Sequence, residues 1–333
     1  MTLKICTIGC GSMASHVHGP SYQEYAARHP DTTLAACCDL DEGKAASFRE
    51  SFGFRRHYTD VDAMLDTERP DAVCIVVPEH LTASVSRRVM AKGYPVMMEK
   101  PPGLNREETT SLIETADRFG VPTQVAFNRR YMPLVRGLKN RLDEQFSPSD
   151  VHLIRYDFCR VNRLDADFAA TAIHGIDAVK HLARSDYAHI QFRYQALPGC
   201  APEVVNTEMI CTFESGTRAY LNFCPVSGVL LERATVHAHD QTFFLDLAVE
   251  NAIDYPGRLL QYRAGREVTE RLGEALVEAE PVFVTGGFYE ENAAFFEDIR
   301  VGRRPAGDLR TALQSVEIAD CMRNRQAEYT KTS

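Results

Sequence analysis

A glycine-rich loop near the start of the chain is the first place where residue types and spacing indicate chemistry. The segment GCGSMA, from Gly9 to Ala14, has the spacing G-x-G-x-x-A. It follows a short apolar run and opens a predicted helix, which is the context that this pattern requires. Gly9 permits a tight turn, Gly11 lets the backbone approach a pyrophosphate, and Ala14 allows a helix to pack closely on a strand. We therefore expect free N–H groups at the helix N-terminus to bind a dinucleotide.

An acidic residue follows the second apolar run. Asp39 lies near the usual position of the acid that binds the hydroxyls of an adenosine ribose, and Asp41 adds a second negative charge. Both carboxylates would repel a 2′-phosphate, and the nearby cation, Lys44, is three residues beyond Asp41. The sequence therefore favours NAD over NADP. The alternative for Asp39 is a helix cap or a solvated turn.

A lysine follows a later apolar run, in the sequence MEKPP from Met98. Ligands of doubly wound sheets bind at the carboxyl edge of the strands, and Lys100 lies at such an edge. Pro101 favours an extended backbone at Lys100. A lysine beside a cationic nicotinamide would suit acid–base work on a hydroxyl. The alternative is an exposed surface lysine.

Polar residues in the second half of the chain are weaker candidates. Asp167, Ala170, His174 and Asp177 share one face of a helix if that helix extends to Asp167. Asp167 either supplies a polar group to a site or only caps the helix, and Asp177 is placed to bond the imidazole and fix its tautomer. His174 taken by itself is more typical of a buried core histidine. Groups suited to a carboxylate or phosphate, or else to surface charge, are Arg129, Arg130, Asn162 and Arg163.

The elements that must position these residues alternate in the first 127 residues. Short apolar runs predict strands at 3–8, 33–38, 72–77, 96–98 and 123–127. Helices are predicted between them, at 12–29, 42–52, 61–66, 83–92 and 106–119. Repeated strand–helix–strand units indicate a doubly wound parallel sheet with right-handed crossovers.

The pattern changes after about residue 128. Helices are predicted at 133–144, 169–183, 289–301 and 308–324, and strands follow one another from Val151 onward, interrupted early by the second of these helices. Strands without intervening helices predict an open, mainly antiparallel sheet. Apolar strands such as ICTF and YLNF indicate an outward face that needs a cover. We expect two domains, residues 1–127 and 128–333.

Composition excludes several classes of function. The chain has 333 residues and a net charge of −9, and it shows no basic stripe, so neither nucleic acid nor an anionic membrane is an expected partner. No apolar stretch is long enough to span a membrane, and no signal peptide precedes the first strand. Ten cysteines without a C-x-x-C pair predict free thiols in the reducing cytoplasm. The histidine pairs His16/His18 and His237/His239 lack further ligands, so no metal is expected.

The sequence resembles the glucose–fructose oxidoreductase, inositol dehydrogenase and MocA family (Gfo/Idh/MocA) over nearly its whole length. The motifs that carry the resemblance are GCGSMA, CDLD around Asp39, MEKPPG, FNRRYMP from Phe127, IHGIDAVKHL from Ile173 and ENAAFFEDIRVGRRP from Glu291. The resemblance implies that Lys100 and His174 flank the nicotinamide and a sugar- or cyclitol-like alcohol. It also implies a homodimer or homotetramer formed through the C-terminal sheet.

Two positions depart from the family pattern. An aspartate is typical four residues before the histidine, where this chain has Ala170. Asparagine and histidine are typical after the third long strand, where the chain has Glu79 and Thr82 instead, with His80 between them. These departures leave two alternatives to a dehydrogenase. One is a lyase or glycosidase that oxidises its substrate only transiently, and the other is an NAD-binding sensor without turnover.

The prediction is a hydride transfer between NAD and a secondary alcohol or ketone of a sugar, sugar acid or cyclitol. Lys100 and His174 are the predicted catalytic residues. The predicted cofactor-binding residues are Gly9, Gly11, Ser12, Met13, Ala14, Asp39, Val77, Pro78, His80, Glu99, Lys100, Pro101 and Asn128. The predicted substrate-binding residues are Arg129, Arg130, Asn162, Arg163, Asp167 and Asp177.

Overall fold

The chain folds into two compact units. The computed structural model describes residues 2–268 and 280–331. The first unit contains Met1–Asn128 together with Gly287–Val316, and the second contains Arg129–Gly286 together with Glu317–Ser333. The sequence-based division after residue 127 assigns everything later to one domain. The structure adds that the segment from Gly287 to Val316 returns to the first unit.

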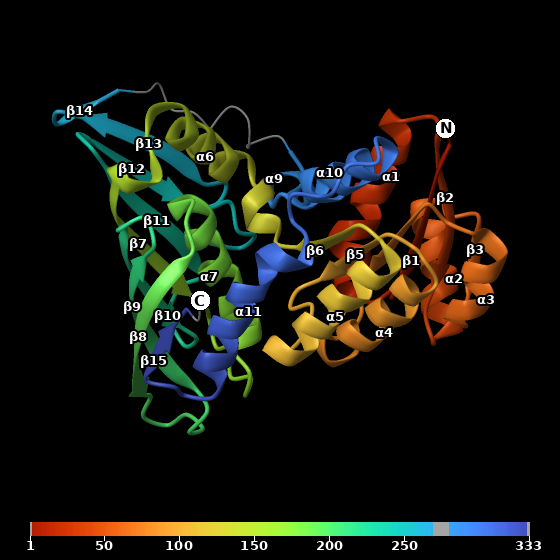
Figure 1. Ribbon diagram of the computed structural model, residues 1–333, viewed down its shortest axis with the longest axis horizontal. Coiled ribbons are helices and arrows are strands. Elements are labelled where there is room, and N and C mark those ends of the chain that lie inside the picture. Colours follow the sequence, from red (N-terminus) through yellow and green to blue (C-terminus); the bar gives the residue numbers. More distant parts are fainter. Residues whose placement is uncertain (1, 269–279, 332–333) are drawn as a thin grey trace. The chain divides into compact units, whose positions relative to one another are not determined.

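A six-stranded sheet forms the centre of the first unit (Figure 1). Its strands are β1 (Leu3–Ile8), β2 (Thr32–Cys38), β3 (Arg56–Tyr58), β4 (Ala72–Ile75), β5 (Val96–Glu99) and β6 (Thr123–Ala126). They lie in the order β3-β2-β1-β4-β5-β6, and every neighbouring pair is parallel. This is the strand order of a dinucleotide-binding Rossmann sheet. The predicted fold class is confirmed; β3 is an additional strand at the edge.

Helices connect these strands as predicted, with two differences. They are α1 (Gly19–Arg28), α2 (Glu42–Phe52), α3 (Val61–Glu68), α4 (Glu79–Ala91) and α5 (Arg106–Phe119). The predicted helix over 12–29 is not uniform, because a π-helical turn over Ala14–His18 precedes α1. Helix α4 begins at Glu79 and not at Ala83, since Pro78 suits the position just before a helix.

The returning segment packs on the same unit. Helix α10 (Phe288–Arg300) lies against α1. Arg300 donates to both carboxylate oxygens of Asp31, at 2.6 and 3.0 Å, and to the hydroxyl of Tyr25 at 2.9 Å. Helix α11 (Leu309–Arg323) then leads from the first unit into the second. The predicted closing helices are therefore confirmed.

A nine-stranded sheet forms the second unit (Figure 1). Its strands are β7 (Val151–Cys159), β8 (Tyr187–Ala196), β9 (Val205–Phe213), β10 (Arg218–Cys224), β11 (Leu231–Ala238), β12 (Gln241–Asp246), β13 (Arg258–Arg263), β14 (Arg266–Glu267) and β15 (Glu328–Thr330). Only the pair β7–β10 is parallel among the pairs of described strands in this sheet. The mainly antiparallel prediction is confirmed, and β13, β14 and β15 were not predicted.

Helix α7 (Ala169–Ala183) covers β7 and β10, and α6 (Pro133–Gln145) covers β12 and β13. Gly175 lets α7 lie close to the sheet. A Cβ at this position would lie 3.0–3.2 Å from the rings of Phe223, Tyr156 and Phe158. The buried hydroxyl of Tyr187 also donates to the carbonyl of Ile176 in α7, at 2.9 Å. A short helix, α9 (Val282–Thr285), precedes the return to the first unit.

The outward face of the nine-stranded sheet carries both polar and apolar side chains, among them the exposed Phe244 and the half-buried Ile210. In ICTF and YLNF the apolar side chains of Phe213, Leu221 and Phe223 are buried toward α7. The residues that alternate with them include Thr212 and Asn222, which are exposed. Successive side chains of a strand point to opposite faces. An apolar run in the sequence therefore overstated what each strand offers to a partner.

All ten cysteines are free, as predicted. Six are buried and four are half-buried, so burial accounts for most but not all of them. Among the described residues, no helix combines the length and apolar character needed to cross a membrane.

Candidate functional site

The glycine-rich loop connects β1 to the π-helical turn and leaves an open approach to its backbone. Gly9 has φ of +96°, and a Cβ there would lie 2.0 Å from the carbonyl oxygen of Val76. Any side chain at Gly9 would therefore collide with the chain that follows β4. A Cβ at Gly11 would meet no atom within 4 Å. The loop thus leaves room at Gly11 for a phosphate beside the helix N-terminus.

Asp39 fastens the end of β2 to this loop. Its carboxylate accepts hydrogen bonds from the backbone N–H of Cys10 at 2.8 Å and of Asp41 at 3.0 Å. Asp41, and not Asp39, caps α2, since its side chain accepts from the N–H of Lys44 at 3.1 Å. Asp39 is half-buried beside the loop. This is the position from which a carboxylate can bond a ribose hydroxyl.

The remaining predicted cofactor residues of the first unit follow its carboxyl strand ends. Ser12 and Met13 are exposed in the loop, whereas Ala14 is buried beneath it. Val77, Pro78 and His80 follow β4, Glu99, Lys100 and Pro101 end or follow β5, and Asn128 follows β6. The strand order reverses between β1 and β4, which is where doubly wound sheets bind ligands. The fold therefore brings the ends that carry these residues to one sheet edge.

A buried network of hydrogen bonds is joined to the backbone of Lys100. The backbone N–H of Lys100 donates to Oε2 of Glu99 at 3.0 Å, and Nε2 of His18 lies 2.9 Å from Oε1 of the same carboxylate. His18 is 1% exposed and belongs to the π-helical turn. Asn292 of α10 in turn bonds Nδ1 of His18 at 3.2 Å. The peptide bond between Lys100 and Pro101 is cis.

His18 and Asn292 are site residues that sequence reasoning missed. Counted along a regular helix, His18 only diverges from His16 and points to no partner. The π-helical turn and the distant α10 bring it to Glu99, and neither is visible in local spacing. The motif ENAAFFEDIR contains Asn292 and supported the family resemblance. It did not indicate which residue Asn292 contacts.

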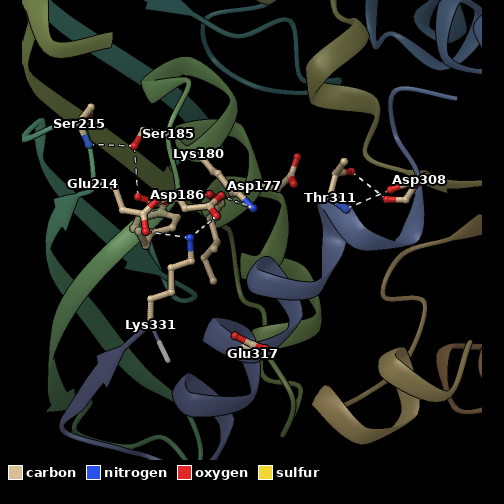
Figure 2. A network of polar contacts seen from close by, with 12 residues as sticks. Asp177, Lys180, Ser185, Asp186, Glu214, Ser215, Asp308, Thr311, Glu317 and Lys331 are labelled. Atoms are coloured by element: carbon tan, nitrogen blue, oxygen red, sulfur yellow. Dashed lines mark hydrogen bonds and ion pairs between the residues drawn. The ribbon is translucent and has the colours of Figure 1, made fainter. Parts of the chain in front are cut away.

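His174 lies on α7 in the second unit and is 9% exposed. The helix that carries it is tied at its C-terminal end by an ionic network, seen in Figure 2. Lys180 of α7 lies 3.1 Å from Asp186, which also accepts from Lys331 at 2.7 Å. Lys331 donates further to Glu214 at 2.8 Å. The last residues of the chain therefore help to fix the helix of the proposed catalytic histidine.

The N-terminal end of α7 is tied by Asp167. Its carboxylate lies 3.4 Å from the backbone N–H of Ala170, which is a cap-type contact, and 2.9 Å from the guanidinium of Arg323. The N-cap residue of α7 is Phe168, which makes no side-chain cap bond, and Asp167 lies one residue earlier, so the capping role of Asp167 stays a prediction. Ala170 lies one turn before His174 on the same helix. A substrate role for Asp167 stays a prediction.

Two buried ion pairs involve the arginines that were candidates for binding substrate. Arg130 forms a bidentate pair with Asp177 of α7, at 2.7 and 2.5 Å. Arg129 donates to the fully buried carboxylate of Glu232 at 2.7 and 3.3 Å. The structure thus gives Arg129, Arg130 and Asp177 protein partners, and their substrate role stays a prediction.

Glu232 collects a second arginine and a tyrosine. Arg160 donates to Oε1 and Tyr156 donates to Oε2 at 2.8 Å. Burial raises the pKa of Glu232, but the charges of Arg129 and Arg160 outweigh it and bring the pKa to about 2. Glu232 is thus an anion that neutralises two guanidinium groups inside the second unit.

The last two candidates lie in an exposed loop after β7. Asn162 has φ of 51°, a left-handed conformation that asparagine tolerates. Arg163 donates to Asp165 at 2.9 Å and to the hydroxyl of Thr171 at 3.0 Å. Among the described residues, no group of three His, Cys, Asp or Glu side chains is placed to hold a metal ion.

The sheet order and the loop define the first unit as a Rossmann-type nucleotide-binding domain. Residues 3–127 match the model of an oxidoreductase family with an NAD-binding Rossmann fold, the Gfo/Idh/MocA family. The match covers the parallel sheet of the first unit.

Relatives extend the comparison. The chain is 31% identical to D-glucoside 3-dehydrogenase of Escherichia coli over 129 residues, 39% of this chain and 36% of that protein. It is 32% identical to inositol 2-dehydrogenase 2 of Saccharopolyspora erythraea over 145 residues, 43% of this chain and 41% of that protein. The matched stretches thus cover about two fifths of these relatives.

A solved structure shows that the likeness in fold covers the second unit too. Levoglucosan dehydrogenase in complex with NADH and levoglucosan matches with a TM-score of 0.84, covering 100% of both chains at 16% identity. At this identity the match shows the fold.

Proposed function

We propose that the chain is an NAD-dependent oxidoreductase that interconverts a secondary alcohol and a ketone on a sugar, a sugar acid or a cyclitol. The observation that carries the proposal is the open backbone at Gly11 beside the Asp39 carboxylate, at the switch point of the parallel sheet. The relatives named for dehydrogenation of a glucoside and of inositol support the substrate class.

The residues of the first unit fit a bound dinucleotide. Gly11 and Ser12 would approach the pyrophosphate, and Asp39 would accept from the ribose hydroxyls. When bound, NAD supplies the hydride acceptor or donor for the reaction. Asp39 and Asp41 would both repel a 2′-phosphate, which favours NAD over NADP.

Lys100 and His174 are the proposed catalytic residues. The amine of Lys100 and the imidazole of His174 are groups that can take or return the proton of a reacting hydroxyl. Ala170 replaces the aspartate that is typical of the family, so we propose that the two remaining groups handle this proton. We also propose a cytoplasmic homodimer or homotetramer that associates through the nine-stranded sheet.

A dehydrogenase screen tests the proposal. The protein is incubated with NAD or NADP and a panel of sugars, sugar acids and cyclitols, and NADH formation is followed by absorbance, with Lys100→Ala as the control. NAD reduction that depends on one panel member and on Lys100 supports it. Product without net NADH would indicate a transiently oxidising lyase or glycosidase, and NAD binding without any turnover would indicate a sensor.

A further inference from the structure

Three segments that are distant in sequence meet at one buried line of hydrogen bonds in the first unit. His18 comes from the π-helical turn after the glycine-rich loop, Glu99 from the end of β5 and Asn292 from α10. His18 and Asn292 are 1% and 0% exposed, and the side chain of Glu99 is 12% exposed. The line ends at the backbone N–H of Lys100.

The hydrogens of Asn292 decide which nitrogen of His18 carries a proton. Nδ2 of Asn292 donates one hydrogen to the carbonyl of Phe288 at 2.7 Å, and its second hydrogen faces Nδ1 of His18 at 3.2 Å. The reverse orientation of the amide would place two oxygens against each other. Nδ1 of His18 is therefore an acceptor, and its proton lies on Nε2. His18 is a neutral imidazole that donates to Glu99.

Glu99 is kept as an anion by these donors. Oε1 receives the proton of His18 at 2.9 Å and Oε2 receives the N–H of Lys100 at 3.0 Å. Burial raises the pKa of Glu99, but the hydrogen bond from His18 and the electrostatic interactions with His18 and Lys100 outweigh burial, so the pKa lies below its usual range. Hydrogen bonds to the charged form of a carboxyl favour that form.

The other groups around this carboxylate do not neutralise it. The ring of Tyr22 lies 6.0 Å from that of His18, and the Phe288 ring lies 5.8 Å away. Burial raises the pKa of Tyr22 well above its usual value and that of Cys74 to about 12, so both stay protonated near neutral pH. Glu291 interacts electrostatically with Cys74 and raises the pKa of that thiol, so Glu291 is a further acidic group in this region. The charge of Lys100 lowers the pKa of Glu99, and the attraction between these two charges is mutual.

We propose that His18 and Asn292 are positioning residues that hold Glu99 ionised directly behind Lys100 and thereby set the charge of that lysine. The role of Lys100 in catalysis rests on the proposed function. The hydrogen-bonded line itself does not, because it is a property of the folded first unit. In this arrangement Asn292 fixes the tautomer of His18. The hydrogen bond from His18 favours the ionised form of Glu99, and the Glu99 carboxylate in turn favours the ammonium form of Lys100.

Infrared spectroscopy of two His18 variants tests the first half of the proposal. His18→Gln retains an N–H donor toward Glu99, whereas His18→Leu removes it. We expect a band of a buried protonated carboxyl at neutral pH in His18→Leu only, and its loss in the double variant His18→Leu/Glu99→Gln. A folded His18→Leu protein without that band, or the same band in His18→Gln, would overturn the proposal.

Chemical labelling tests the second half. An amine-reactive reagent at limiting concentration, read by mass spectrometry, reports the neutral fraction of each lysine. Loss of the neighbouring anion in Glu99→Gln and His18→Leu should speed labelling of Lys100 by about threefold to tenfold, since the neutral fraction rises about tenfold for each pKa unit lost. The rate of Lys100 labelling should not change in His18→Gln, and the rate of Lys139 labelling in the second unit should not change in any variant. Unchanged labelling of Lys100 in Glu99→Gln contradicts the proposal.

A third measurement observes His18 directly in the wild-type protein. Magnetic resonance of isotope-labelled histidine in the wild-type protein gives the protonated nitrogen of His18, with His18→Gln used to assign the signal. A neutral ring with its proton on Nε2 supports the proposal, and an imidazolium or an Nδ1–H ring refutes it. None of these readouts needs turnover, so a failed substrate screen would reject the proposed function and leave this test intact.

Discussion

At the scale of single residues, Asp39 combines a structural and a recognition role in one carboxylate. It bonds the N–H of Cys10 within the glycine-rich loop and remains half-buried at the strand end. A 2′-phosphate placed near it would meet two negative charges, from Asp39 and Asp41, with Lys44 already 4.0 Å from Asp41. The proposed preference for NAD therefore rests on the repulsion between these two carboxylates and a 2′-phosphate.

Asp39→Ala should weaken NAD binding by about tenfold or more, because a hydrogen bond to a charged group contributes about 1.5–3 kcal/mol. The preference over NADP should narrow in the same variant. Equilibrium titration with both nucleotides measures both effects. Asp60→Ala is the control, since Asp60 only caps α3 and its loss should leave NAD affinity unchanged. Wild-type protein that binds NADP as tightly as NAD would contradict the prediction.

Glu232 is the buried anion that pairs with two arginines in the second unit. Its removal leaves Arg129 and Arg160 buried without their anion. Glu232→Gln should lower the free energy of unfolding by about 3–5 kcal/mol, the usual cost of breaking a buried pair. Chemical denaturation measures this loss. Glu24→Gln, which breaks the exposed pair with Arg28, should cost under about 1 kcal/mol. Equal losses of unfolding free energy in Glu232→Gln and Glu24→Gln would mean that burial of an ion pair does not affect its contribution to stability.

The pH dependence of stability follows from the same carboxylate. The pKa of Glu232 is lowered to about 2 in the folded protein, against an ordinary value near 4.3 in the unfolded chain. The folded state therefore binds the proton less readily, and the contribution of Glu232 is complete above about pH 4.3 and is lost as the pH falls toward about 2. Unfolding free energies across this window should fall more steeply in the wild type than in Glu232→Gln. Parallel curves for the two proteins would contradict the assignment.

At the scale of elements, α7 is positioned by close approach to the sheet and by ties at both ends. Gly175 lies beside three aromatic rings, next to His174. Gly175→Val should destabilise the protein by roughly 1–3 kcal/mol, as overpacking of a core does. Gly137→Ala in α6 is the matched control, because a Cβ there meets only Leu259, at 3.9 Å. It should be neutral or stabilise by up to about 1 kcal/mol. Thermal unfolding of both variants measures the contrast, and a stabilised Gly175→Val would show that α7 does not need this contact.

At the scale of the whole molecule, the two proposed catalytic residues belong to different compact units. If they handle one proton together, Lys100→Ala and His174→Ala should each lower kcat by roughly 10²-fold or more while NAD affinity changes little. The double variant should lose much less than the product of the two, because groups that act as a unit are not additive. Steady-state kinetics on the substrate found in the screen measures this. Turnover that is unaffected by Lys100→Ala would reject the proposed mechanism, while the proposed cofactor site would still stand.

Association through the nine-stranded sheet is the second prediction at this scale. The outward face presents polar residues together with apolar ones such as the exposed Phe244, so an interface there would combine polar and apolar contacts. We expect a dimer or tetramer by sedimentation, and charge reversal at Arg155, which is exposed on β7, should weaken it. A monomer near 37.3 kDa at micromolar concentration would refute the prediction.

The sequence by itself determined the order of strands and helices in the first unit and the loop that follows its first strand. These features depend on local properties: the apolar run to Ile8, the turn that only glycine permits at Gly9, and the caps Asp41 and Asn105. Because parallel strands place their carboxyl ends at one edge, the sequence also predicted which residues gather there. Helix α7 was predicted with the same bounds, because its apolar run and its end are local too.

The tertiary structure alone decided the partners of those residues. Arg130 pairs with Asp177 across the second unit, and α10 returns to the first unit to place Asn292 against His18. A π-helical turn, whose extra residue per turn leaves no mark in apolar spacing, rotates His18 toward Glu99. Likewise, only the strand register decides which of the alternating side chains of ICTF face α7. Hydrogen bonds and register join residues far apart in the chain, and a pattern of neighbours carries no information about such distances.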